Sequence, residues 1–205
     1  KFQLIIAYQP NPSFSEVVDK AVQANVNLWF ISGNQTDFAW MNSKNLGVGF
    51  KMSSQPEYYT AQLDKSFGLF TPEELSFSEL PPLEHPFGSL QIPSGFNTLL
   101  QAEVRGVGTG SPLFGFTENK GQRFGYLFGE GIWKWRLNTY VETHSFETFD
   151  RFVDKAVQYL VSDNSRKSLV VNHERFYNSG EPIQITAQYF DKNYEFDPKA
   201  RLQVV

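Results

Sequence analysis

The chain contains no cysteine, so any chemistry it performs must come from other side chains. It can form neither a disulfide nor a thiolate metal site, and it has no thiol nucleophile. The serine best placed for nucleophilic attack is Ser32, which opens a turn at 32–35 after the apolar run 26–31. Phe30 and Asn34 replace the glycines of the Gly-x-Ser-x-Gly signature. We therefore favour a serine that hydrogen-bonds its own turn.

Carboxylates and histidines are the other candidates for chemistry. Asp37, Glu130 and Glu142 could supply the two acids of a glycosidase, but the sequence leaves open which of them converge. The histidines lack the spacing of metal ligands, so we predict no metal and no cofactor. They are His85, His144 and His173, and the first lies among prolines that predict a long surface loop.

Trp133, Trp135 and Arg136 form the most distinctive cluster of side chains in the sequence. They could line a pocket in which the arginine binds a carboxylate or a sugar. The alternative is that they pack the core or a domain junction, and we favour it because large aromatic residues usually stabilise such contacts.

A β-α-β unit is predicted to position the turn at 32–35. Apolar runs at 2–8 and 26–31 are typical of strands buried on both faces, as in a parallel sheet. Ser13 and Glu16 match a capping box, and apolar residues at helical spacing follow them. The crossover between the strands is expected to be right-handed.

The pattern changes further along the chain. Between 47 and 128, short alternating stretches separated by proline and glycine indicate strands and turns. Residues 132–140 suit a helix or an irregular segment, and an amphipathic helix is predicted from Ser145. Alternating stretches within 163–205 predict strands that begin a β-sandwich. We expect two domains, at 1–162 and 163–205.

Residues 31–35, Ile-Ser-Gly-Asn-Gln, resemble the Cys-x-Gly-x-Gln elbow of class I glutamine amidotransferases. Gly33 and Gln35 match that motif, whereas Ile31 stands where the family has its catalytic cysteine. The resemblance implies an α/β, flavodoxin-like sheet with flanking helices. It also implies that the first strands of the family's sheet lie upstream of this chain. Backbone amides of the elbow could still hold a small anion or a carbonyl group.

A second segment resembles the Phe-His-Pro-Glu element of the same family. Phe128 matches, Gly129 stands at the histidine position, and the acid is displaced to Glu130. The family's reaction needs a thiolate and a histidine that moves the proton, and this chain has neither at these positions. Because such residues act as a unit, we predict no amidotransferase activity.

A third resemblance concerns residues 129–137. They are similar to a Gly-x-Gly-Leu-Trp-x-Trp-Arg segment of uncharacterised bacterial membrane proteins that carry an amidotransferase-like domain. Residues 177–189 resemble the start of an immunoglobulin-like or macroglobulin-like β domain. Together they imply a bacterial cell envelope protein, on its periplasmic face, with any membrane anchors outside this chain.

Charge and hydropathy restrict the partners. The net charge is −4, and no basic face is evident, so we predict no nucleic-acid binding. No apolar run is long enough to span a membrane. The expected partners are a small molecule or other envelope proteins. A dimer could form through the β tail, whose last strand leaves an open edge.

The function expected from the sequence is non-catalytic binding or scaffolding. The binding surface would lie around 32–35 and 129–136. The alternative is a hydrolase that uses Ser32 or Glu130 in the same pocket, and it requires a base within hydrogen-bond reach of the hydroxyl. A third interpretation is a domain that only spaces its neighbours.

Overall fold

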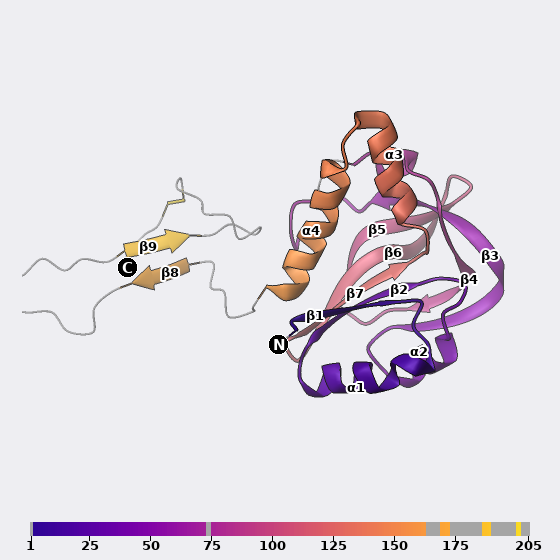
Figure 1. The fold of residues 1–205 in the computed structure, drawn as a ribbon, viewed down its shortest axis with the longest axis horizontal. Coiled ribbons are helices and arrows are strands. Elements are labelled where there is room, and N and C mark those ends of the chain that lie inside the picture. Colours follow the sequence, from indigo (N-terminus) through magenta and orange to yellow (C-terminus); the bar gives the residue numbers. More distant parts are fainter. Residues whose placement is uncertain (1, 73–74, 163–168, 173–185, 190–199, 202–205) are drawn as a thin grey trace, which may run out of the picture.

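The computed structural model describes residues 2–72, 75–162, 169–172, 186–189 and 200–201. Its centre is a seven-stranded sheet in the order β1-β2-β7-β6-β5-β3-β4 (Figure 1). The strands are β1 (Leu4–Tyr8), β2 (Asn27–Ser32), β3 (Gly49–Leu63), β4 (Leu83–Gln91), β5 (Asn97–Val104), β6 (Val107–Asn119) and β7 (Gln122–Phe128).

The predicted β-α-β unit is confirmed. β1 pairs in parallel with β2, and the helix α1 (Ser15–Gln23) connects them. The helix starts differently from the capping-box prediction, because a short 3₁₀ helix (Pro12–Phe14) precedes it. The side chain of Asn11, not Ser13, caps that turn by accepting a hydrogen bond from the Ser13 backbone N–H at 3.0 Å.

The prediction of a flavodoxin-like fold is wrong. Only β1, β2 and β7 run parallel, and each remaining pair in the sheet is antiparallel. The reason lies in the connections: β5, β6 and β7 follow one another through tight turns, which join antiparallel strands, whereas a parallel pair needs a long crossover. The short alternating stretches between 47 and 128 build this antiparallel part of the sheet.

The proline-rich segment is also different from the prediction. It is not a surface loop, because it contains β4, which pairs with β3 at the end of the sheet. Pro86 is tolerated there because a strand at a sheet edge does not need every backbone N–H for pairing. The consequence is that His85 is carried into the interior, where it is 3% exposed.

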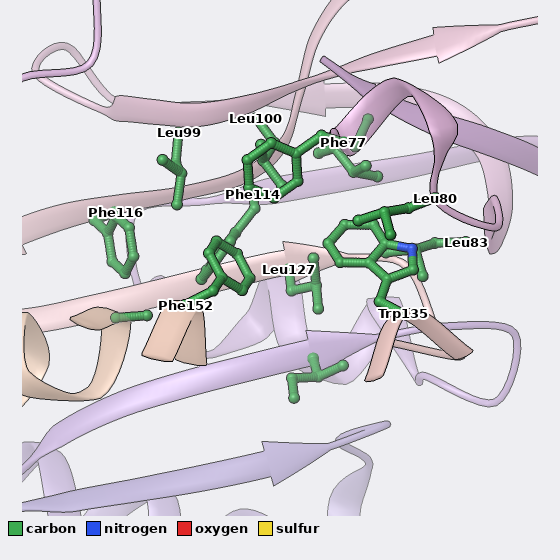
Figure 2. Close-up of a cluster of buried hydrophobic side chains, with 14 of the residues drawn as sticks. Phe77, Leu80, Leu83, Leu99, Leu100, Phe114, Phe116, Leu127, Trp135 and Phe152 are labelled. Carbon is green, nitrogen blue, oxygen red and sulfur yellow. The ribbon is translucent and has the colours of Figure 1, made fainter. Parts of the chain in front are cut away.

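Helices cover both faces of the sheet (Figure 1). α1 and α2 (Phe38–Ser43) lie on one side, and α3 (Trp133–Thr143) and α4 (Glu147–Val161) form a hairpin on the other. The larger core lies beneath α3 and α4, and Figure 2 shows its side chains meeting between the helices and the sheet. Its most buried aromatic residues are Phe114, Phe116, Trp135 and Phe152.

Two short strands follow the helices. β8 (Leu169–Asn172) and β9 (Thr186–Tyr189) form an antiparallel pair within the part of the tail where strands were predicted. The rest of 163–205, apart from 200–201, lies outside the described residues, so the division at 162 and the β-sandwich stay predictions. No helix in the described part of the chain is long and apolar enough to cross a membrane.

Candidate functional site

The carboxyl ends of β1, β2 and β7 meet at one edge of the sheet, because the three strands are parallel. Ligands of α/β sheets commonly bind at such an edge. Four side chains from separate segments converge here, and we call them the strand-end cluster: Gln9, Asn34, Glu84 and Glu130. Each is half-buried.

Hydrogen bonds hold the strand-end cluster together. The Asn34 Nδ2 amine donates to Glu84 Oε1 and, at 2.9 Å, to Glu130 Oε1. Gln9 Nε2 donates to the second oxygen of Glu130. The Glu84 and Glu130 backbones also bond to each other, with N···O distances of 3.2 and 2.9 Å. Two carboxylates are thus fixed side by side by carboxamides and by the backbone.

The backbone amides of the elbow do not form the expected anion site. The Gly33 N–H donates to Thr36 Oγ1 at 2.9 Å, and the Gln35 N–H donates to Gln9 Oε1 at 2.5 Å. Both donors are therefore engaged, and the groups beside them are carboxylates. An anion would meet repulsion here, so the chemistry of the cluster favours a cation or a donor of hydrogen bonds.

Ser32, at the end of β2, lies within hydrogen-bond reach of a histidine. Its Oγ is 3.1 Å from His85 Nε2 and 3.3 Å from the Leu127 carbonyl oxygen. The other ring nitrogen, Nδ1, is 2.9 Å from the Pro86 carbonyl oxygen. A carbonyl can only accept, so Nδ1 carries the proton and Nε2 is an acceptor. The single O–H of Ser32 is then shared between Nε2 and the Leu127 carbonyl.

This serine–histidine pair is buried. Ser32 is 1% exposed, and aromatic rings surround the imidazole. Burial lowers the pKa of His85 to about 4, so the ring is neutral at pH 7. A cavity of about 50 Å³ reaches His85, yet Ser32 does not line it. The rings in contact with the imidazole are Phe38, Phe50, Tyr59 and Phe128.

The positions that correspond to the amidotransferase cysteine and histidine are packed. Ile31 belongs to the larger core and is 9% exposed. A Cβ atom added to Gly129 would lie 2.6 Å from the Leu83 Cβ, which leaves no room for a side chain. The site thus lacks both catalytic groups, and at Gly129 it also lacks the space that a histidine would occupy.

Replacing Gly129 with alanine is expected to lower the free energy of unfolding by about 1–3 kcal/mol, because the new methyl group overpacks the contact with Leu83. Chemical denaturation measures the loss. The matched control is Gly108→Ala, because a Cβ there meets nothing within 4 Å. Equal stability of the two variants would contradict the packing described at Gly129.

The tryptophan and arginine cluster belongs to the first turn of α3, and its side chains make other contacts than those of the strand-end cluster. Trp135 is 1% exposed in the core (Figure 2). Its Nε1–H donates to the Pro81 carbonyl at 2.6 Å. Arg136 forms an ion pair with Asp150 of α4 at 2.7 Å and lies over a phenylalanine ring. Trp133 is 58% exposed. Trp135 and Arg136 thus pack the helical hairpin, whereas Trp133 remains on the surface.

The carboxylates suggested by the sequence do not converge with one another. Asp37 caps α2 through the Trp40 N–H at 2.8 Å, and Glu142 accepts from Asn138 on α3. Glu130 is joined instead by Glu84, which the sequence did not indicate.

Sequence reasoning missed Gln9 and Glu84, and it placed His85 in a surface loop. Gln9 directly follows the first strand, so the sequence could have indicated that it lies at the carboxyl end of that strand, beside the elbow. The other two could be found only once β4 was recognised as a strand. In the described part of the chain, no three histidine, aspartate or glutamate side chains group as metal ligands would.

Comparison with known proteins leaves the family open. No protein-family model matches the sequence. No curated protein proved similar in sequence either. Among solved structures, a β-galactosidase from Bacillus circulans sp. alkalophilus is similar over 86% of this chain and 26% of its own, with 10% identity and a TM-score of 0.43. The present chain thus spans about a quarter of that chain. Similarity this distant assigns neither a family nor an activity.

Proposed function

We propose that this chain is a non-catalytic binding module and that the strand-end cluster holds its ligand. The observation that carries the proposal is the convergence of four half-buried polar side chains at the carboxyl ends of β1, β2 and β7, beside a hydroxyl that is sealed. The side chains of the cluster are two carboxylates and two carboxamides, which can hold a ligand through hydrogen bonds.

The ligand chemistry follows from the cluster. Within the described residues, neither Glu84 nor Glu130 forms an ion pair with a lysine or an arginine. An ionised carboxylate offers about four acceptor sites, so both groups keep capacity after their internal hydrogen bonds are made. A small ligand with a guanidinium or ammonium group would satisfy that capacity through charge-assisted hydrogen bonds.

Agmatine, which carries both cationic groups, is the probe for this proposal. We expect saturable shifts of the backbone amides around Gln9, Asn34 and Glu130 in two-dimensional NMR spectra of the labelled 205-residue chain. Glu130→Gln should weaken agmatine binding at least about tenfold, because it removes the charge between two cluster carboxamides. The fold of the variant is checked in the same spectra.

Two controls make the titration specific. Glu142→Gln removes an exposed carboxylate on α3, away from the cluster, and should bind agmatine as the unchanged chain does. Acetate should give no shifts at the cluster. An absence of saturable shifts with agmatine, or equal weakening by Glu130→Gln and Glu142→Gln, would overturn the proposed site and favour a domain that only spaces its neighbours.

A hydrolase is the second candidate, and one observation favours it: Ser32 Oγ is 3.1 Å from the His85 base. A neutral imidazole that accepts from a serine is the arrangement that general-base activation requires. The burial of both residues stands against it, since a substrate must reach the hydroxyl. The chain could act as a hydrolase only if the aromatic rings around His85 moved apart and let a substrate reach Ser32.

The resemblance of residues 129–137 to bacterial membrane proteins is the reason to place the module in a cell envelope. Under this proposal its partners are small cationic molecules or neighbouring envelope proteins, and any membrane anchor belongs to sequence outside these 205 residues. Fractionation of cells that express the full gene product, followed by immunodetection, would test the location.

A further inference from the structure

The outer side of β1 is an open sheet edge. β1 is the end strand of the sheet, and no strand pairs with its outer side in the part of the chain that the structure describes. The Gln3 carbonyl accepts a hydrogen bond from the Asn27 N–H at 3.2 Å, and the Gln9 N–H donates to the Ile31 carbonyl at 2.7 Å. Both groups therefore point inward, toward β2. Because backbone groups alternate in direction along a strand, those of Leu4, Ile6 and Tyr8 point outward.

The opposite edge of the sheet is protected, and β1 is not. On β4, the backbone of Glu84 bonds to Glu130, and Pro86 lacks an N–H group. β3 and β4 also shift register between Met52 and Pro56. Prolines, charges and irregular register are the usual devices that prevent edge pairing. The sequence of β1, Leu-Ile-Ile-Ala-Tyr, contains none of them.

Apolar side chains flank this open edge on both faces of the sheet. Ile6 and Tyr8 share one face and are 49% and 50% exposed. On the other face, Val17 of α1 is 47% exposed. Ser15 of the same helix binds Trp40 of α2, and Asp19 binds Lys44 just beyond the end of α2. Val17 is two residues from each, so it lies on the side of α1 away from α2 and toward β1.

We propose that a second copy of this chain pairs antiparallel with β1 about a two-fold axis at Ile6. The outward backbone groups are symmetric about that residue, so Ile6 would pair with Ile6 and Leu4 with Tyr8. Each such pair exchanges two hydrogen bonds in an antiparallel ladder. The edge is therefore complementary to itself, as a two-fold interface requires.

The charges around the edge fit a second copy as well. β1 carries no charged side chain, so two copies bring no like charges together in the ladder. The two α1 helices would also run antiparallel across the axis. Within one helix, Glu16 and Lys20 form an ion pair. Because the two helices would run in opposite directions, Glu16 of one copy would approach Lys20 of the other. Complementary charge of this kind favours the homodimer over an arbitrary strand.

Sedimentation of the 205-residue chain tests the proposal. We expect a dimer whose dissociation constant rises at least about tenfold in Ile6→Lys, because two like charges then face each other across the axis. Met52→Lys is the matched control, since Met52 is 61% exposed on β3, away from β1. A monomeric chain would overturn the proposal. So would an undiminished dimer of Ile6→Lys, which would point to the β tail.

A cross-linking measurement keeps the test independent of the lysine variant. Because the chain has no cysteine, Ile6→Cys introduces a single thiol. Paired residues in the ladder have Cα atoms about 5.5 Å apart, which a disulfide can span. Diamide should therefore give a covalent dimer faster with Ile6→Cys than with Met52→Cys. Equal rates for the two variants would overturn the pairing at Ile6.

Discussion

Trp135→Ala is expected to lower the free energy of unfolding by about 3–5 kcal/mol, because truncation of a buried aromatic residue leaves a cavity. The indole is 1% exposed, lies against Phe77 and Phe152, and donates its N–H to the Pro81 carbonyl. Figure 2 shows it between the helical hairpin and the sheet. Urea denaturation of the variant measures the loss.

Trp133 provides the control from the same short segment. It is 58% exposed, so Trp133→Ala should change the free energy of unfolding by about 0.5 kcal/mol or less. Similar losses for the two variants would contradict the assignment of Trp135 to the core. Neither tryptophan belongs to the strand-end cluster, so the comparison of the two variants measures stability without changing the proposed binding site.

Acidification should destabilise the protein through His85. Its pKa is about 4 in the folded chain and 6.5 in the unfolded chain, so between these values only the unfolded state takes up the proton. Stability therefore falls as the pH drops from 6.5 to 4, by about 3 kcal/mol from this residue. Above pH 6.5 the histidine is neutral in both states and its contribution to the pH dependence is absent.

The contribution of His85 is isolated by comparison with His85→Gln, whose side chain does not titrate. Unfolding free energies of both proteins are measured by denaturation at several values between pH 4 and pH 7. The unchanged chain should lose about 3 kcal/mol more than the variant over this interval. Parallel curves would show that the imidazole is not buried in its neutral form.

The β-α-β unit could be predicted because its signals are local. Apolar runs at 2–8 and 26–31 enclose a helical repeat, and β2 is buried on both faces as a continuous apolar run implies. The same expectation was wrong for β1, which lies at the edge of the sheet and leaves Ile6 and Tyr8 about half exposed. The elbow at 32–35 then follows from the end of the second strand. The core position of Trp135 was also the favoured interpretation, since burial of a large aromatic ring stabilises a fold strongly.

The overall fold and most of the strand-end cluster depend on long-range pairing, which local patterns do not reveal. Four prolines suggested a loop around His85, but an edge strand tolerates proline, and pairing with β3 made that segment β4. Glu84 meets Glu130 only because β4 returns beside the end of β7. The resemblance to amidotransferases was based on motifs at one edge of the sheet. The prediction drawn from it concerned the arrangement of the whole sheet, and those motifs do not determine that arrangement.

The inaccessibility of the Ser32 hydroxyl is tested most directly by incubating the chain with a fluorophosphonate and measuring the intact mass of the protein. Such reagents phosphonylate an activated serine Oγ and release fluoride. A sealed, non-catalytic elbow predicts an unmodified mass, identical in behaviour to that of Ser32→Ala. A stoichiometric adduct that fragmentation places on Ser32, and that Ser32→Ala lacks, would contradict the non-catalytic account and establish the serine–histidine pair as a reactive site.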